Sequence, residues 1–444
     1  MNERMIILET LLLIDKENGF DNKIINQVLD KFSYLDKQER SFIKRVVEGT
    51  VERRLELDYI INCYSNTKIN KCKPVIRALL RMSVYQLKYM DTVPESAVCN
   101  EAVKIASKKG FSTLKGFVNG VLRNIARNIE NIEYPDINTI EGLSIRYSCP
   151  EWLVKQLVSE QGMDITEAIL KDSLEAKPLY VRTNQSRIST DDLRRRFEAA
   201  NLSYKKAPYL PYAFVLNNID SLERIDAFNE GLFQVQDLSS MLVAELAGIN
   251  PGDTVVDCCA APGGKSMHAL DILNGTGRVI SCDVSEYKVN MIRDNVTRCG
   301  FTNSELMVAD ATVHNSQLDN TADVLIADLP CSGLGVIGRK NDIKYNISID
   351  KEESLVKLQR QILENVSRYV KPGGIMMFST CTIHRAENED NVEWIEKNLD
   401  FTQVPIKDKL PDALAKRCRG GYIQLLPGMD RTDGFFVAKF IKKQ

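Results

Sequence analysis

The sequence lacks the cysteine patterns of metal-binding and disulfide-rich proteins. Its eleven cysteines are scattered over 444 residues, and no two of them form a Cys-x-x-Cys pair. Zinc sites use such pairs, and small secreted domains space their cysteines densely to build disulfide frameworks. We therefore expect no metal, reduced thiols and a cytoplasmic location.

Long apolar runs are missing as well. The apolar run at residues 5–14 contains Glu9 and is too short to cross a bilayer. With 44% hydrophobic and 27% charged residues, the composition is ordinary for a globular protein, and the length suits two or three domains. These features argue against secretion and membrane insertion.

The chain also lacks the usual phosphate-binding loops, although one stretch resembles a ligand loop. Residues 254–265 (TVVDCCAAPGGK) predict a buried strand, a tight turn and the start of a helix. This stretch is neither Gly-x-Gly-x-x-Gly nor a Walker-type loop, which disfavours a dinucleotide or a triphosphate. Gly263 and Gly264 would still let the backbone approach a ligand that a Cβ would exclude.

Three later strands also end in an acid. They lead to Asp283, Asp310 and Asp328, and ligands of open α/β sheets bind at the carboxyl ends of the strands. An acid after the second strand can accept both ribose hydroxyls, and one after the third can accept an adenine amino group. An apolar strand capped by Asp is common, but four in series favour an S-adenosylmethionine pocket.

Two cysteines are predicted at the same edge of this sheet. Cys331 follows Asp328-Leu-Pro, and Cys381 lies in Ser-Thr-Cys-Thr after the strand at residues 374–378. A single cysteine is more often a small buried apolar residue than a nucleophile. Two at the ligand edge of one sheet indicate thiol chemistry, and their spacing leaves open which of them attacks. His384 and the nearby Glu387 follow Cys381 and could suggest a Cys/His hydrolytic pair. We favour the interpretation that these residues are simply the polar start of a helix.

The region before this sheet divides into two parts. Residues 2–128 show helical periodicity almost throughout, predict six or seven helices, and carry 22 Lys+Arg against 15 Asp+Glu, which favours a polyanionic partner. Residues 178–216 predict a small α+β subdomain, in which a strand carries Arg182 and a helix carries Arg194, Arg195 and Arg196. Its basic residues suit single-stranded RNA, and a linker with a charged face is an equal alternative.

Four segments of the helical region resemble the NusB-type RNA-binding fold: residues 36–40, 46–50, 78–87 and 117–123. Because a methyltransferase-like region follows, the chain resembles the ribosomal RNA small subunit methyltransferase B family, also called RsmB, Sun or Fmu. The resemblance implies a NusB-like all-α domain at residues 1–130, a small α+β RNA-binding subdomain at 131–230, and an α/β Rossmann-like methyltransferase domain at 231–444.

The resemblance also implies the chemistry. The family transfers methyl groups from S-adenosylmethionine to C5 of a cytosine in 16S ribosomal RNA through a covalent cysteine adduct at C6. DNA cytosine-5 methyltransferases would suggest Cys331 as nucleophile, whereas the RNA family implies that Cys381 attacks and Cys331 assists release. Asp328 would bind the cytosine N3 edge near the transferable methyl, and Lys265 would position base or cofactor. The implied cofactor residues are Cys259, Ala260, Ala261, Pro262, Gly263, Gly264, Lys265, Asp283, Asp310 and Asp328.

A basic loop resembles the family's substrate loop. Arg339 and Lys340 match its pattern, whereas Gly338 and Asn341 stand where an arginine and a proline are expected, which puts its rigidity and one phosphate contact in doubt. We expect a monomer that binds 16S RNA and no membrane. The alternatives are a cytosine-5 methyltransferase for transfer RNA and a non-catalytic RNA-binding assembly factor.

Overall fold

A computed structural model describes residues 2–17, 22–32 and 34–444. The chain forms two compact units, which are described separately. The first contains residues 1–175 together with the short segment Ile337–Asn346, and the second contains residues 176–336 and 347–444.

The first unit is helical. Its core consists of aliphatic side chains from the first seven α-helices and includes Leu8, Val46, Leu79 and Leu122, which have no exposed surface. The described helices of this unit are α1 (Glu3–Glu17), α2 (Asn22–Lys31), α3 (Lys37–Glu52), α4 (Arg54–Tyr64), α5 (Pro74–Tyr89), α6 (Glu95–Lys108), α7 (Lys115–Asn128), α8 (Ile140–Arg146), α9 (Glu151–Gln161), α10 (Met163–Asp172) and α16 (Ile343–Asn346). The helical character expected for residues 2–128 is confirmed.

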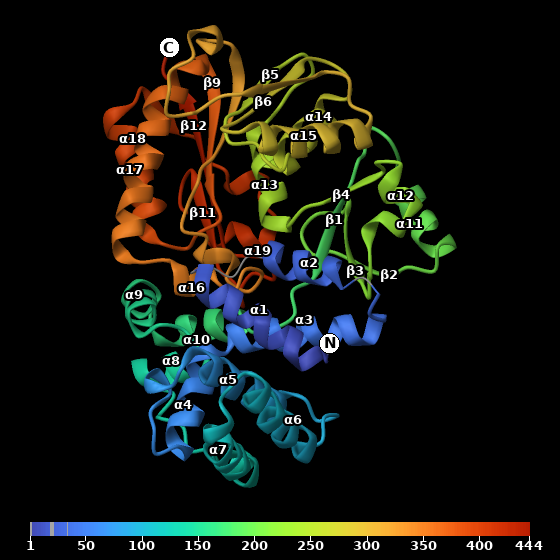
Figure 1. Cartoon of the computed structure of the whole chain (residues 1–444). Coiled ribbons are helices and arrows are strands. Elements are labelled where there is room, and N and C mark those ends of the chain that lie inside the picture. Colours follow the sequence, from blue (N-terminus) through green and yellow to red (C-terminus); the bar gives the residue numbers. More distant parts are fainter. Residues whose placement is uncertain (1, 18–21, 33) are drawn as a thin grey trace. The chain divides into compact units, whose positions relative to one another are not determined.

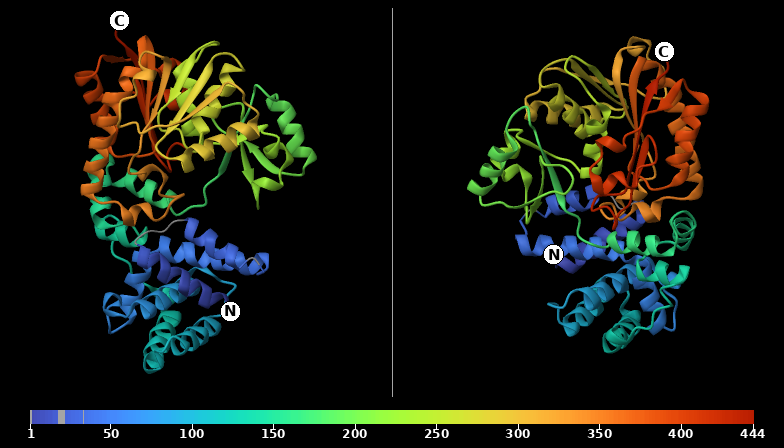
Figure 2. Two further views of the ribbon diagram at one scale, coloured as in Figure 1. Left: turned by 45° about the horizontal axis from the view of Figure 1, so that its top comes forward. Right: turned by 180° about the vertical axis from the view of Figure 1, so that it is seen from behind.

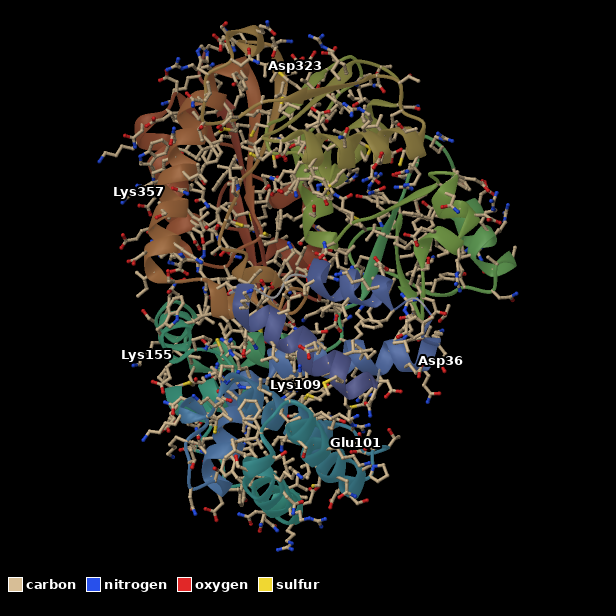
Figure 3. All side chains as sticks on the ribbon, in the orientation of Figure 1. Asp36, Glu101, Lys109, Lys155, Asp323 and Lys357 are labelled. Carbon is tan, nitrogen blue, oxygen red and sulfur yellow. The ribbon has the colours of Figure 1, made fainter. Side chains whose placement is uncertain are left out.

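Local signals in the sequence fix several helix starts. Asp36, which is labelled in Figure 3, directly precedes α3. Asp36 and Glu39 form a capping box there, each side chain accepting from the other residue's backbone N–H. Pro74 occupies the first turn of α5, and Pro94 directly precedes α6. Both prolines therefore stand at helix starts, where the missing backbone N–H costs no intrahelical hydrogen bond.

The first unit extends beyond residue 130. The Tyr134 hydroxyl donates to Glu56 at 2.7 Å, and the Leu55 backbone N–H donates to the Ser148 hydroxyl at 2.8 Å, so the region around α8 packs against α4. The segment 337–346 also belongs here, because the Tyr345 hydroxyl lies 2.9 Å from the carbonyl oxygens of Glu52 and Ser148. These contacts therefore cross the domain boundary that the sequence predicted at residue 130. That boundary stays a prediction.

The second unit begins with a small antiparallel sheet of order β2-β3-β1-β4. Helix α11 (Thr190–Ala199) packs across one face through Leu193 and Phe197 (Figure 2). The strands are β1 (Leu179–Thr183), β2 (Ser203–Lys206), β3 (Ala213–Asn217) and β4 (Phe233–Val235), and the short helix α12 (Asp226–Asn229) precedes β4. The sequence assigned β4 to the methyltransferase domain, but β4 pairs with β1, so this sheet continues past residue 230.

A large mixed sheet forms the rest of this unit. Its order is β10-β12-β9-β8-β5-β6-β7, with β11 paired to β12; the strands from β9 to β7 along this order run parallel, and β12 is antiparallel to β9. The strands are β5 (Thr254–Asp257), β6 (Arg278–Asp283), β7 (Ser304–Val308), β8 (Ala322–Asp328), β9 (Val370–Thr380), β10 (Phe401–Gln403), β11 (Tyr422–Leu425) and β12 (Phe435–Lys442).

Helices cover both faces of the large sheet (Figure 1). Helices α13 (Leu238–Ala247), α14 (Gly264–Leu273), α15 (Glu286–Cys299) and the short α19 (Asp412–Ala415) pack on one face, and α17 (Ile349–Val366) and α18 (Glu389–Asn398) pack on the other. Asp323 marks the amino-terminal edge of the sheet, where it accepts from the Thr254 backbone N–H (Figure 3). The residues predicted to carry chemistry follow the opposite, carboxyl-terminal ends of the strands.

Candidate active site

The loop between β5 and α14 has the compact geometry that the sequence predicted. Gly263 has a φ of 104°, a left-handed conformation that favours glycine, and a Cβ there would lie 3.3 Å from Ile292. At Gly264 a Cβ would meet only Gln236, at 3.9 Å, so the start of the helix is open to a ligand. The Ala260 N–H donates to the Cys282 carbonyl at 2.9 Å, which fixes the loop against β6.

Asp257 ends β5 beneath this loop and is almost completely buried. Its Oδ2 accepts from Ser266 at 2.7 Å, while Oδ1 has no hydrogen-bond partner among the described residues. Burial raises the pKa of this carboxyl to about 7, although the Ser266 hydrogen bond and the nearby Lys265 oppose the shift. A buried acceptor without a partner at the end of a strand fits a site that takes a ligand with hydrogen-bond donors.

Asp283 and Asp310 follow the next two strands. The Asp283 carboxylate is buried, accepts from the backbone N–H groups of Ala261 (3.0 Å) and Val284 (2.8 Å), and lies 3.0 Å from Lys288. Asp310 is exposed, and hydrogen bonds from the Thr312 side chain and backbone hold the pKa of its carboxyl below the usual value.

These residues fit an S-adenosylmethionine site. The glycine loop leaves space for a ligand, Asp257 offers a buried acceptor, and Asp283 places a carboxylate at the end of the neighbouring strand. The predicted cofactor loop, Cys259 to Lys265, lies between β5, which ends in Asp257, and β6, which ends in Asp283.

A partly buried ion pair joins the loop to β8. The Lys265 ammonium lies 2.6 Å from Asp328 Oδ2, and the Ser379 hydroxyl donates to Asp328 Oδ1 at 2.7 Å. The pKa of Lys265 is raised: burial lowers it, and the charges of Asp328, Asp257 and Cys381 more than compensate. Lys265 thus remains a cation near the Cys381 sulfur, and Asp328 is held by partners on two other elements.

The two cysteines meet. The sulfur atoms of Cys331 and Cys381 lie 3.3 Å apart, each following one of the paired parallel strands β8 and β9. The pKa of Cys331 lies well above its usual range because its thiol hydrogen-bonds to Cys381 and because it is buried, close to the Cys381 sulfur and to Glu387. The strand-end geometry that the sequence predicted for this pair is therefore present.

Glu387 is the residue that the sequence interpretation undervalued. We predicted only a polar start of a helix for residues 384–389, but Glu387 has no exposed surface. Its carboxylate accepts from the backbone N–H and the hydroxyl of Ser332, directly after Cys331, and from Gln359 on α17. A charged residue three positions into a short polar stretch gives no sequence signal for burial.

Arg182 corrects one of the predicted RNA contacts. Its side chain has no exposed surface and pairs with Asp271 of α14 at 2.5 Å, with further hydrogen bonds to Asn184 and Gln236. A guanidinium enclosed between β1 and α14 cannot reach an RNA strand in this structure. The burial of Arg182 could not be predicted, because the sequence pattern of residues 178–184 does not show which element covers that face of the sheet.

The other predicted RNA contacts are on the surface, with partners. Arg194 pairs with Glu198 at 2.8 Å, Arg195 with Asp192 at 2.7 Å and Arg196 with Glu230 at 2.5 Å. The expected arginine cluster of α11 is therefore interleaved with acids. Arg339 and Lys340 lie in the segment 337–346, which belongs to the helical unit. Cys331 and Cys381 belong to the other unit.

The helical unit has a basic cavity of about 410 Å³, which the sequence did not reveal. Among the described residues, no carboxylate forms an ion pair with Lys88, Arg146 or Lys171 on its wall. The buried Glu56 is already bound by Arg53, Tyr89 and Tyr134, and the exposed Glu175 is the other acid of the wall. The cavity therefore has a surplus of positive charge.

Two further observations concern the described residues only. No three of their histidine, cysteine or acidic side chains are grouped so that they could hold a metal ion. No helix within these ranges has both the length and the apolar composition needed to cross a membrane.

Comparison with protein families assigns all three parts of the chain. Residues 245–441 match the family described as 16S rRNA methyltransferase RsmB/F, residues 1–127 match the NusB family, and residues 149–222 match the ferredoxin-like domain of RsmF/B-like methyltransferases. The expected NusB-like, α+β and methyltransferase architecture is confirmed.

Individual relatives cover the chain from end to end. A probable ribosomal RNA small subunit methyltransferase B of Bacillus subtilis is 34% identical and covers 99% of this chain and 98% of its own. A probable enzyme of the same name from Synechocystis is 28% identical over 100% of both chains.

Solved structures agree with this assignment. One crystal structure with 24% identity aligns over 100% of this chain and 99% of its own with a TM-score of 0.81, which establishes the fold. A methyltransferase homologue from Pyrococcus horikoshii is 26% identical and aligns over 68% of this chain and 98% of its own with a TM-score of 0.59. The chain belongs to the ribosomal RNA small subunit methyltransferase B family.

Proposed function

We propose that this member of an rRNA methyltransferase family transfers the methyl group of S-adenosylmethionine to C5 of a cytosine in 16S ribosomal RNA. The observation that carries the proposal is the cysteine pair, with sulfur atoms 3.3 Å apart, next to a partly buried Lys265–Asp328 ion pair. Methyl transfer to an oxygen or to an exocyclic nitrogen needs no thiol, whereas C5 of cytosine must first be activated by a nucleophile at C6.

The Cys381 thiolate is the proposed nucleophile. It would form a bond to C6 of the cytosine while N3 takes up a proton from water, and Asp328 would accept a hydrogen bond from the resulting N3–H. The Lys265 cation, which interacts with Cys381 and holds Asp328, stabilises negative charge on the attacking sulfur. The electron pair that develops at C5 would form the bond to the transferred methyl carbon, and the bond from that carbon to the donor sulfur would break with its electrons remaining on the sulfur.

S-adenosylmethionine would supply the methyl group in electrophilic form, bonded to a positively charged sulfur. The loop from Cys259 to Gly264 together with Lys265 would surround it, with Asp283 on the ribose hydroxyls and Asp310 near the adenine. Asp328 would lie close to the methyl group. These assignments are proposals, and the fit of the loop and the buried Asp257 acceptor supports them.

Cys331 is proposed to assist product release. After C5 is methylated, its proton passes to water, the C–H electron pair restores the ring double bond, and the C6–S bond breaks with its electrons returning to Cys381. N3 then returns its proton to water. Because the raised pKa of Cys331 keeps it as a thiol, it can donate a hydrogen bond to the departing Cys381 sulfur 3.3 Å away. This division of roles matches the one that the resemblance implied.

RNA is proposed to bind through exposed cations. Lys340 on the segment 337–346 and the basic cavity of the helical unit supply positive charge that is suited to a phosphodiester backbone. The target base must be unstacked before a thiol can reach C6. We propose a cytoplasmic monomer, and the eleven free cysteines support a reducing compartment.

Labelled methyl transfer to unmodified 16S RNA tests the function. We expect wild type to form 5-methylcytosine, Cys381→Ala to be inactive, and Cys331→Ala to accumulate a covalent protein–RNA adduct on a denaturing gel. An adduct in Cys381→Ala instead would exchange the two roles. Methylation of transfer RNA in place of 16S RNA would support a tRNA enzyme, and failure to bind S-adenosylmethionine would support a non-catalytic assembly factor.

A further inference from the structure

Glu387 is a buried carboxylate next to the proposed catalytic loops, outside the residues given a role above. It has no exposed surface and accepts hydrogen bonds from three donors: the backbone N–H of Ser332 at 2.9 Å, the Ser332 hydroxyl, and Gln359 Nε2 at 2.9 Å. A set made only of donors suits an ionised carboxylate, which accepts and cannot donate. Burial of such a group is costly unless it is hydrogen-bonded in this way.

The partners of Glu387 belong to both cysteine loops. Ser332 follows Cys331, and its hydroxyl lies 2.7 Å from the hydroxyl of Thr382, which follows Cys381. Gln359 also donates to the Pro330 carbonyl at 2.9 Å, on the other side of Cys331. Glu387 thus binds the residue after Cys331 directly, and its partner Gln359 binds the residue before it. Through the Ser332 hydroxyl it also reaches the loop of Cys381.

Gln359 is itself held in one orientation. Its side-chain oxygen accepts from Asn391 of α18 at 2.8 Å, so its amide nitrogen must face Glu387 and Pro330. The Asn391 amide also donates to the Glu387 carbonyl at 3.1 Å. Helices α17 and α18 therefore supply a preformed support for the carboxylate.

The charges around the two sulfurs differ. Glu387 interacts with Cys331, and the groups that face Glu387 are His384, with Nδ1 at 3.6 Å, and beyond it Glu352, at 3.9 Å from the same nitrogen. On the other side of the pair, the Lys265 cation interacts with Cys381. A negative group thus lies next to one cysteine and a positive group next to the other.

We propose that Glu387 is a positioning residue that holds the Cys331 loop against the Cys381 loop and, through its negative charge, makes Cys331 the proton-bearing member of the pair. The inference rests on the proposed cysteine chemistry, and it explains how two adjacent thiols acquire different roles. A carboxylate next to Cys331 disfavours the thiolate there, so that Cys381 carries the negative charge.

Thiol alkylation tests the inference without RNA or cofactor, and so independently of methyl transfer. The full-length chain is treated with iodoacetamide over a range of pH, and mass spectrometry follows the peptides of Cys331 and Cys381 separately. In wild type, Cys381 should react at lower pH than Cys331. In Glu387→Gln, the pH midpoint for Cys331 should fall by about one unit, which is about tenfold more thiolate at a given pH.

Two variants separate charge from packing. Glu387→Asp keeps the charge and should retain the high midpoint of Cys331 even where the shorter side chain slows methyl transfer. Glu393→Gln, on the exposed face of α18, is the matched control and should change neither thiol.

An unchanged Cys331 midpoint in Glu387→Gln, or an equal fall in Glu387→Asp, would overturn the inference. If Glu387→Gln does not fold, a high Cys331 midpoint in Glu387→Asp supports the inference and a lowered one refutes it. Normal thiol midpoints in a chain that does not methylate RNA would contradict the proposed function and leave the role of Glu387 standing.

Discussion

Removing one partner of the buried ion pair between Arg182 and Asp271 should strongly destabilise the second unit. Asp271 accepts from the Arg182 guanidinium, from the backbone N–H groups of Gln185 (2.9 Å) and Ser186 (2.8 Å), and from the Ser186 hydroxyl (2.6 Å). Asp271→Asn keeps the shape and leaves a guanidinium buried without a counter-ion. Breaking a buried pair in this way costs about 3–5 kcal/mol.

The cost should be visible in thermal or urea unfolding of the full-length chain. For a unit of this size, about 4 kcal/mol corresponds to a fall of roughly 10 °C in melting temperature. Glu305→Gln is the matched control, because it breaks the exposed pair with Arg278 at 3.0 Å and should cost at most about 1 kcal/mol.

A double variant tests the cause of this loss. Arg182→Met with Asp271→Leu removes both charges and should recover much of the stability, since apolar pairs often replace buried ion pairs at little cost. A loss below about 1 kcal/mol in Asp271→Asn, or no recovery in the double variant, would refute the reasoning.

Two further predictions concern pH and salt. Because burial raises the folded-state pKa of Asp257 to about 7, the native state holds a proton that the unfolded state has lost between about pH 4 and pH 7, so stability should fall as pH rises through this window. In wild type, the free energy of unfolding should fall by about 1.4 kcal/mol per pH unit within this window, and Asp257→Asn should lack this pH dependence. If urea unfolding shows the same pH dependence for both proteins, the raised pKa does not belong to Asp257. Lys88→Glu with Lys171→Glu should weaken 16S RNA binding about tenfold and flatten its salt dependence, whereas Lys155→Glu on α9 should not; equal effects in a filter-binding assay would exclude the cavity as an RNA site.

The sequence predicted what depends on short segments. Asp257, Asp283 and Asp328 follow apolar runs, and the carboxyl ends of parallel strands meet at one sheet edge, so their arrangement follows from the strand assignment. The same reasoning placed Cys331 and Cys381 together, and the sulfur separation of 3.3 Å agrees with it. The three-part fold was predictable because its resemblance extends over nearly the whole chain.

The sequence could not predict what depends on packing between distant segments. Arg182 and Asp271 are 89 positions apart, and neither has a neighbour that indicates burial. Glu387 and Ser332 are 55 positions apart and contact each other only because β8 and β9 are adjacent. Charged residues are exposed by default, so a buried charge appears in a sequence as an ordinary surface residue. The pairing of β4 with β1 could not be predicted for the same reason, since β1 lies about 50 residues earlier in the sequence.

The segment 337–346 shows how such packing alters the meaning of a sequence difference. Gly338 and Asn341 replace residues that would stiffen the family's loop, and the sequence therefore put its rigidity in doubt. In the structure, the ring of Tyr345 lies 4.0 Å from the Arg54 guanidinium, and its hydroxyl is within 2.9 Å of two carbonyl oxygens of the helical unit. Asn341 and Glu52 line the same pocket of the helical unit, and burial raises the pKa of the Glu52 carboxyl. The end of the segment is thus fixed by aromatic and hydrogen-bond contacts, so the missing proline need not make it loose.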